Sequence, residues 1–295
     1  MKDLISIRDL DRETIYHLFE QADAMQRMHL QKEEYTPLKD KTILTSFPPS
    51  SLRTRVSFEA AVYQLGAQPL NLQMKLEDPE WIEDKVGHLN CWLDGLVIRH
   101  EDQQLVRKIG ELAEFAVING MTKESHPCEI LSDLHGIRSL RPNFEELNFV
   151  FVGEGANISN TWFEAAAKLD LNMTQACPKG YEINEELYSY ARQHSKGKIR
   201  VTNDLEEALL GADIILTDGW PKDEEDLEKF MPYQLSLEKL KACNKGCLVN
   251  PCPPINRNHG VTTEVMDSPC FIGYKIKESL LYMQKAILAE LMTTS

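Results

Sequence analysis

A polar segment that follows two prolines has the clearest potential for chemistry, and it spans Ser51 to Arg55. The prolines end a predicted strand, and Ser50 or Ser51 is placed to cap the helix that follows. The N–H groups and the positive dipole end of a helix start favour an anion. Arg53 adds a cation that can form two hydrogen bonds, and Thr54 adds a hydroxyl group. These residues suit a phosphate, although a capped surface helix with solvated arginines explains them equally well.

The overall charge limits the partners that such a site could serve. The 295-residue chain has 46 acidic and 32 basic residues, a net charge of −14, and such a surface repels nucleic acid backbones. No apolar run approaches the roughly 18 residues of a membrane span. Residues 1–21 predict a short strand and an acidic amphipathic helix, not a targeting peptide. We therefore expect a soluble cytoplasmic protein that binds small molecules, with no nucleic acid and no membrane partner.

The elements that must position this segment alternate between strand and helix. In the first half of the chain, apolar runs predict strands at 41–47, 68–72, 95–100 and 116–120. Helical periodicity predicts helices at 11–29, 53–65, 81–92, 103–115 and 126–138. This alternation is typical of a mostly parallel sheet that is covered by helices.

A polar, proline-containing stretch at 138–146 precedes a second alternating series. Its predicted strands are 147–155, 172–178, 198–204 and 213–220, and its predicted helices are 160–171, 185–195 and 205–212. The fold class is therefore α/β, with two parallel-sheet domains linked by interdomain helices. The expected domains are residues 1–140, completed by the C-terminal helix 277–295 that packs back on it, and residues 141–276.

The cysteines favour neither a disulfide framework nor a metal site. Their number, seven, is odd, and the chain is far larger than disulfide-stapled scaffolds, so we expect reduced thiols. Cys243, Cys247 and Cys252 are close in sequence, but no CxxC pair or ligand histidine accompanies them at zinc-finger spacing. Structural cysteines are therefore the favoured interpretation.

The segment SLRTRVSFE at 51–59 is similar to the S-T-R-T-R-x-S-F-E phosphate loop of aspartate and ornithine carbamoyltransferases. Further segments resemble this family, in its order, across nearly the whole chain. They are VIRH at 97–100, HPCEILSDL at 126–134, FVGEGANISN at 151–160, TDGW at 217–220 and PCPPINRNHGVTTEVMDSP at 251–269. The number and order of these matches favour the phosphate interpretation of the first segment.

The resemblance implies transfer of a carbamoyl group from carbamoyl phosphate to an amine, with no cofactor and no metal. The implied phosphate ligands are Ser51, the backbone of Leu52, Arg53, Thr54 and Arg99. His126, at a predicted helix start, would donate a hydrogen bond to the carbonyl oxygen, which becomes an oxyanion. The leaving phosphate can accept the proton of the amine, so no protein base is required. The catalytic candidates are Arg53, Arg99, His126 and Cys252.

Several carbamoyl-phosphate positions depart from the family. Leu52 replaces a threonine, and Glu129 replaces the glutamine that fixes the carbamoyl amino group, which adds a negative charge that should weaken anion binding. The loop at 250–254 fits the family in two registers. In one, Asn250 replaces the histidine of an H-x-L-P motif and Cys252 takes the leucine position. In the other, Cys252 coincides with the reactive-site cysteine of ornithine enzymes; a buried small hydrophobic residue is the structural alternative.

The acceptor half resembles ornithine enzymes more than aspartate enzymes. Asn157 and Asp218 occupy the positions that meet the carboxylate and α-amino groups of ornithine. The loop KLEDPEW at 75–81 is acidic, so it should repel aspartate and favour a cationic acceptor. The segment from Pro221 to Glu224 replaces an S-M-G loop. An ornithine-like amino acid or amine is therefore the expected acceptor.

The C-terminal segment lacks a ligand-binding arginine of ornithine enzymes, because Leu280 takes its place. Lys275 and Lys277 lie just upstream and are expected at a solvated helix edge. Together with Glu129 and Asn250, this departure keeps open a non-catalytic or regulatory paralogue that retains the fold and the anion site.

Two further interpretations concern the second domain and the assembly. A dinucleotide-dependent oxidoreductase is a weaker alternative, because GEG at 153–155 follows a strand but Ile158 replaces the third glycine of the fingerprint. The resemblance also implies a homotrimer in which the loop at 75–81 reaches a neighbouring subunit.

Overall fold

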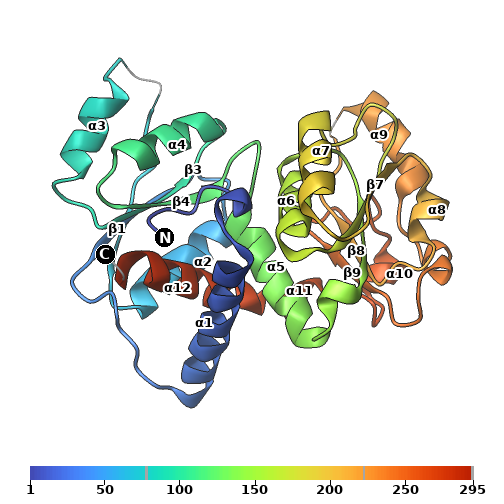
Figure 1. Cartoon of the computed structure of the whole chain (residues 1–295), viewed down its shortest axis with the longest axis horizontal. Helices are drawn as coiled ribbons and strands as arrows, with labels where there is room; N and C mark the ends of the chain where they lie inside the picture. Colours follow the sequence, from blue (N-terminus) through green and yellow to red (C-terminus); the bar gives the residue numbers. More distant parts are fainter. Residues whose placement is uncertain (77–78, 222, 294–295) are drawn as a thin grey trace. The chain divides into compact units, whose positions relative to one another are not determined.

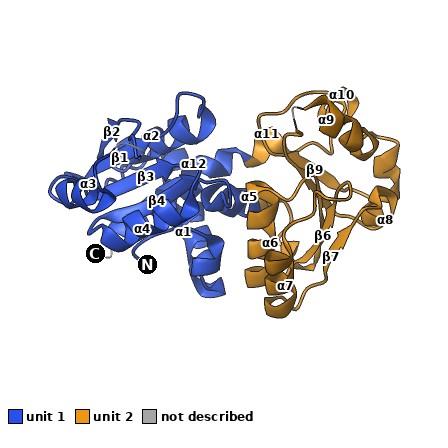
Figure 2. Cartoon of the chain, turned by 90° about the horizontal axis from the view of Figure 1, so that it is seen from above, with its two compact units in different colours: residues 1–136, 277–295 blue, residues 137–276 orange. Residues whose placement is uncertain are grey.

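A computed structural model describes residues 1–76, 79–221 and 223–293. The chain forms two compact units (Figure 2): unit 1 comprises Met1–Gly136 and Lys277–Ser295, and unit 2 comprises Ile137–Ile276. Each unit contains one parallel sheet, of four and five strands respectively. The prediction of two parallel-sheet α/β domains is confirmed.

The sheet of unit 1 has the strand order β2-β1-β3-β4. Its strands are β1 (Thr42–Ser46), β2 (Gln68–Asn71), β3 (Gly95–Arg99) and β4 (Ala116–Met121). The surrounding helices are η1 (Ile7–Asp9), α1 (Arg12–Gln31), α2 (Arg53–Gln64), α3 (Ile82–Leu89), α4 (Gln103–Leu112), the first part of α5 (Pro127–Leu140) and α12 (Glu278–Thr293). Figure 1 shows α12 beside α1 and α2, so the C-terminal helix packs back on the first unit as predicted.

The core of unit 1 explains why these short apolar runs form strands. Three neighbouring strands and α4 share one buried apolar cluster. The strands contribute Leu44, Leu96, Ile98 and Val117. Strands that are covered by helices on both faces read as continuous hydrophobic runs, which is the pattern that β3 shows. The buried run ends at Arg99, and a polar edge follows.

The N-terminal strand that the sequence predicts is not formed. Leu4 makes only an isolated parallel bridge to Ile118, at the edge of the sheet. The chain then turns at once into η1, because the Ser6 side chain accepts a hydrogen bond from Arg8 N and the Asp9 carboxylate accepts one from Ser6 N. This capping box stops the strand pairing after one residue.

The sheet of unit 2 has the strand order β7-β6-β5-β8-β9. Its strands are β5 (Asn148–Val152), β6 (Asn172–Ala176), β7 (Ile199–Thr202), β8 (Ile214–Thr217) and β9 (Leu248–Pro251). Its helices are α6 (Asn157–Leu169), α7 (Glu185–His194), α8 (Leu205–Leu209), α9 (Glu224–Phe230), α10 (Thr263–Met266) and α11 (Gly273–Ile276), with the 3-10 turns η2 (Phe144–Glu146), η3 (Met231–Tyr233) and η4 (Lys239–Ala242). The sequence did not predict β9, α9, α10 or α11.

The strand order of each sheet reverses at one place. In unit 1 the chain moves outward from β1 to β2 and then returns to the other side of β1 with β3. In unit 2 the same reversal lies between β5 and β8. In open parallel sheets, ligands bind beyond the carboxyl ends of the strands at such a switch point, because the two connections leave in opposite directions. The fold therefore marks one candidate site in each unit.

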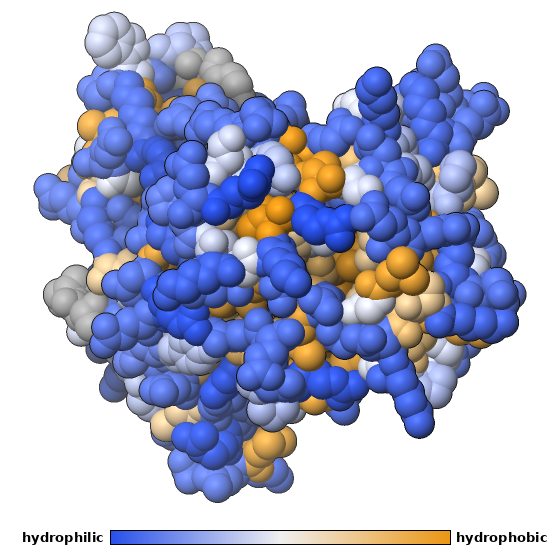
Figure 3. Space-filling view, turned by 45° about the vertical axis from the view of Figure 1, so that its right-hand side comes forward, coloured by the Kyte–Doolittle hydropathy of each residue, from blue (hydrophilic) through white to orange (hydrophobic). Residues whose placement is uncertain are grey.

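The visible surface is mostly polar (Figure 3). Most of the face in Figure 3 is hydrophilic, as expected of a chain with 46 acidic and 32 basic residues. In the described part of the chain, no helix is both long and apolar enough to span a membrane.

Candidate functional site

The switch point of unit 1 brings together two of the predicted phosphate ligands. Ser51 lies in the connection after β1, and Arg99 is the last residue of β3. The Arg99 guanidinium donates a hydrogen bond to the Ser51 hydroxyl across 3.5 Å. Burial lowers the pKa of the Arg99 guanidinium below its ordinary value. A partly desolvated cation attracts an anion more strongly than a hydrated one does, so this position suits a phosphate.

The start of α2 supplies the other predicted phosphate ligands, Leu52, Arg53 and Thr54. The expected cap by Ser50 or Ser51 is wrong: Leu52 occupies the N-cap position in helical conformation, and no side chain caps the helix. The physical reason is that Ser51 N donates to the Pro48 carbonyl in a turn, while the Ser51 hydroxyl meets Arg99. A serine cap would require the helix to begin at residue 52, but its first residue is Arg53. The buried Thr54 side chain lies in the first turn.

Arg55 makes a contact within its own helix, as in the alternative interpretation of this segment as an ordinary surface helix. Its Nε donates to Glu59 Oε1 at 2.8 Å, one helical turn along α2. The two arginines of the segment therefore differ in their contacts: the half-buried Arg55 is paired with Glu59, whereas the exposed Arg53 begins the helix beside Thr54.

His126 lies at the start of α5, as predicted. It is buried, and its carbonyl accepts the first helical hydrogen bond, from Ile130 N. Burial, assisted by the charges of Arg99 and Lys277, lowers the pKa of His126 to about 4, although Glu129 opposes the shift. At neutral pH the imidazole is therefore uncharged and can donate one hydrogen bond from a ring N–H.

Glu129 lies one turn into α5 and is also buried. Burial alone would raise the pKa of its carboxyl group, but the charges of Lys277, His126 and Arg53 outweigh burial and lower it. The carboxylate forms an ion pair with the Lys277 ammonium, which also lies 2.6 Å from Asp133 Oδ1. Lys277 therefore offsets part of the negative charge that, from the sequence, is expected to weaken anion binding.

The expected solvated position of the two C-terminal lysines is wrong for one of them. Lys275 is exposed, but the Lys277 side chain is only 18% exposed and reaches α5. The sequence contained one signal for this contact, since a glutamate in place of a neutral glutamine at 129 requires a nearby cation when it is buried. The partner could not be identified from the sequence, because 148 residues separate it from Glu129.

The switch point of unit 2 brings together the predicted acceptor residues. Asn157 begins α6 directly after β5, because the Ser159 hydroxyl accepts from Ala156 N and starts the helix earlier than predicted. Asp218 follows β8, and its Oδ1 accepts a hydrogen bond from Gly219 N at 2.7 Å. Since β5 and β8 are adjacent and parallel, both side chains stand at the same edge of the sheet.

Cys252 lies beside Asp218 in unit 2. Its N–H donates to the Thr217 carbonyl at 2.7 Å, which extends the pairing of β9 with β8. Cys252, Asp218 and Trp220 line one small cavity of about 20 Å³. Asn250, the position that differs in one register of this loop, is buried inside β9. Cys252 thus belongs to unit 2, whereas the other residues predicted for carbamoyl phosphate belong to unit 1.

Two predicted acceptor loops fall partly outside the described residues. In the loop at 75–81, Glu77 and Asp78 are not described, and the exposed Trp81 precedes α3. In the segment from 221 to 224, Lys222 is not described, and the Asp223 side chain caps α9 by accepting from Glu225 N.

Gly155 of the GEG segment has a packing role. A side chain at Gly155 would meet the backbone oxygen of Glu182 at 2.4 Å, and Gly155 N donates to the Tyr181 carbonyl at 2.7 Å. Close approach of two loops therefore requires glycine at 155, and this reason has no connection with a dinucleotide.

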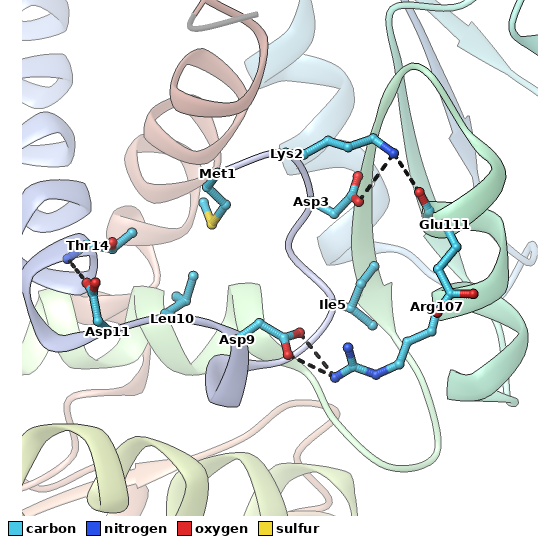
Figure 4. A pocket seen from close by; sticks show the side chains of 11 residues that line it. Met1, Lys2, Asp3, Ile5, Asp9, Leu10, Asp11, Thr14, Arg107 and Glu111 are labelled. Carbon is cyan, nitrogen blue, oxygen red and sulfur yellow. Dashed lines mark hydrogen bonds and ion pairs between the residues drawn. The ribbon is translucent and has the colours of Figure 1, made fainter.

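A larger cavity lies elsewhere in unit 1. It has a volume of about 540 Å³, and Figure 4 shows the Asp9 carboxylate facing the Arg107 guanidinium in its wall, at 3.1 Å. The Lys2 side chain closes another part of the wall by donating to the Gly110 carbonyl. None of the predicted site residues lines this cavity.

Comparison with known proteins finds two family models, which meet near residue 140; the second extends through most of α12, which the structure places in unit 1. Residues 2–139 match the family model for the carbamoyl-P binding domain of aspartate/ornithine carbamoyltransferase, and residues 145–291 match the model for its Asp/Orn binding domain. The ornithine carbamoyltransferase of Syntrophus aciditrophicus is 36% identical, over 97% of this chain and 98% of that protein. The ornithine carbamoyltransferase of Methanosphaera stadtmanae is also 36% identical, over 98% of each.

Solved structures show the same similarity. The ornithine carbamoyltransferase from Pyrococcus furiosus superposes with a TM-score of 0.96 at 31% identity, over 99% of this chain and 97% of that chain. The ornithine carbamoyltransferase from Burkholderia thailandensis superposes with a TM-score of 0.91 at 29% identity, over 99% of each.

Proposed function

Since the chain belongs to the aspartate/ornithine carbamoyltransferase family and is a carbamoyltransferase, we propose that its acceptor is an ornithine-like amino acid or amine. In the proposed reaction the acceptor's amino group attacks the carbonyl carbon of carbamoyl phosphate, and phosphate leaves. Unit 1 binds the donor, and unit 2 binds the acceptor.

The observation that carries the donor half of this proposal is the pairing of Arg99 with Ser51 at the switch point of unit 1. Arg99, Arg53 and the Thr54 hydroxyl supply two cations and a hydroxyl to the phosphate, together with Ser51 and the backbone of Leu52. These groups attract the donor and stabilise the negative charge that grows on the phosphate as it leaves.

His126 acts on the carbamoyl carbonyl in this proposal. As a buried neutral imidazole, it donates a hydrogen bond to the carbonyl oxygen, and this bond strengthens as the oxygen becomes an oxyanion. The amine adds to the carbonyl carbon to form the C–N bond and the oxyanion. The C=O bond then re-forms as the C–O bond to phosphate breaks, and the departing phosphate accepts the proton of the amine. The Glu129 carboxylate accepts a hydrogen bond from the carbamoyl NH₂ group.

The acceptor half rests on Asn157 and Asp218, which stand at one edge of the second sheet. The Asp218 carboxylate pairs with the α-ammonium group of the acceptor, and the Asn157 amide donates to its carboxylate. Cys252, which lines a cavity with Asp218, contacts the transferred carbamoyl group. An anionic side chain would be disfavoured beside this carboxylate, so an ornithine-like acceptor fits better than aspartate.

We also propose that the protein is a homotrimer. The support is a set of exposed apolar side chains, here called the exposed apolar strip, on and next to the edge strand β2 and α2, where a second subunit can pack. The strip consists of Leu52, Val56, Tyr63, Leu70 and Leu72.

A direct test separates a working donor site from a non-catalytic paralogue. Carbamoyl phosphate is titrated into the purified protein by calorimetry, and binding that disappears in Arg53→Ala supports the proposal. Absence of binding to the unmodified protein favours the non-catalytic alternative. Turnover with a panel of amines then identifies the acceptor.

A further inference from the structure

Lys277 ties the start of α12 to α5. The chain enters unit 1 for the second time at this residue, and α12 begins directly after it. The Lys277 ammonium contacts Glu129 Oε1 and lies 2.6 Å from Asp133 Oδ1. The two carboxylate side chains are only 7% and 2% exposed. One lysine therefore serves two buried acids on successive turns of α5.

A cation is required at this place. Glu129 and Asp133 are four residues apart, so their side chains lie on the same face of the helix. Removing one partner of a buried ion pair leaves an uncompensated charge, which is far more costly than losing an exposed pair. Without Lys277, one of the two acids would have to take up a proton or reach solvent.

The same face of α5 carries His126, three residues before Glu129. The charges of Lys277 and Arg53 lower the pKa of the Glu129 carboxyl, and the His126 imidazole is influenced by the charges of Glu129, Arg99 and Lys277. Lys277 is therefore connected, through Glu129, to the residues that surround the proposed donor site.

We propose that Lys277 is a positioning residue of the donor site, which orients the Glu129 carboxylate and offsets its charge. Glu129 can then accept a hydrogen bond from the carbamoyl NH₂ group without repelling the phosphate of the same molecule. The ion pair of Glu129 with Lys277 thus takes the role that a neutral glutamine side chain at 129 would fill without a partner. The inference rests on the proposed function, because it assigns Glu129 to carbamoyl phosphate.

The test measures binding of phosphonoacetamide, a stable probe in which a carbon atom replaces the bridging oxygen of carbamoyl phosphate. Calorimetry is performed at neutral pH on the full chain and on four variants: Lys277→Met, Glu129→Gln, Glu129→Gln/Lys277→Met and Lys275→Met. Lys275 is the matched control, because it is exposed and only two residues away. Thermal unfolding of each variant confirms that it is folded.

We expect Lys277→Met to weaken binding by about tenfold or more, because Glu129 then lacks the counter-charge of the Lys277 ammonium. Lys275→Met should bind like the unmodified chain. The double variant should return to within about threefold of Glu129→Gln, since the acid that then lacks Lys277 is Asp133, which lies one turn further from His126 along α5 than residue 129 does. In turnover, Lys277→Met should raise the donor KM more than it lowers kcat, a split that a merely structural role would not produce.

Unchanged binding in Lys277→Met would overturn the inference while leaving the proposed function intact. Failure of the unmodified chain to bind the probe would contradict the proposed function itself, and the inference with it. If Lys277→Met does not fold, the comparison of the double variant with Glu129→Gln decides the question. A tenfold gap between those two proteins would show that Lys277 does not act through Glu129.

Discussion

The Arg99 guanidinium donates a hydrogen bond to the Ser51 hydroxyl, and this contact joins the ends of β3 and β1 where the strand order of the first sheet reverses. The two residues are separated by 48 positions in the sequence. The parallel pairing of β1 with β3 brings them together, because it carries both carboxyl ends to the same edge. The proposed phosphate site is therefore a product of topology as much as of residue type.

His126 should act on the chemical step more than on binding. Replacing it by asparagine should lower kcat by about a hundredfold or more, the loss that is typical of one oxyanion donor. The donor KM should change much less. Steady-state kinetics with carbamoyl phosphate varied at saturating acceptor would measure both constants. An asparagine variant with unchanged kcat would show that the imidazole does not polarise the carbonyl.

The stability of the protein should also depend on pH through His126. Its pKa is lowered from 6.5 to about 4 in the folded protein, so the unfolded chain binds more protons between these values. The contribution of the neutral imidazole is complete above pH 6.5 and decreases as the pH falls towards 4, by up to ~3 kcal/mol. Denaturant unfolding at several pH values should show that the free energy of unfolding depends less on pH in His126→Gln than in the unmodified chain. Equal slopes for the two proteins would contradict the burial of a neutral imidazole.

Asp218 should control the acceptor and not the donor. Asp218→Asn removes the charge that pairs with the α-ammonium group, so the acceptor KM should rise by about tenfold or more. The donor KM should stay within about twofold, because Asp218 belongs to unit 2. Asp223→Asn provides a control, since that carboxylate only caps α9. Equal effects of the two substitutions would remove Asp218 from the acceptor site.

The homotrimer can be checked by light scattering. The expected mass is about three times the chain mass of 33.7 kDa. Val56→Asp places a charge in the exposed apolar strip and should shift the protein towards monomer, whereas an aspartate at the exposed Leu30 should not. A mass of one chain for the unmodified protein would contradict a site shared between subunits.

Most of the fold could be predicted from the sequence, because buried parallel strands and amphipathic helices leave distinct periodicities. The strand β9 (Leu248–Pro251) is absent from the prediction, because the resemblance assigns residues 250–254 to a loop. The N-terminal strand was wrongly predicted because Ser6 and Asp9 form a capping box instead. Pairing with β8 decided the first outcome and a local capping box decided the second, and the hydrophobic pattern contains neither.

The candidate site was predictable wherever its residues lie within one short segment. Ser51 to Thr54 and His126 to Glu129 fall in such segments. Lys277 was placed wrongly at a solvated edge, because its contact with Glu129 exists only when α12 packs back on the first unit. Long-range ion pairs of this kind depend on tertiary packing and leave no periodic signal in the sequence.

Formation of ureido product tests the central claim most directly. Purified protein is incubated with carbamoyl phosphate and a panel that contains ornithine, other amino acids, diamines and polyamines. We predict turnover with an ornithine-like amine, a loss of about a hundredfold or more in kcat/KM for Arg53→Ala, and little change for Arg55→Ala, whose guanidinium is paired with Glu59 on the surface of α2. No product with any amine of the panel, or equal losses in the two arginine variants, would contradict the account.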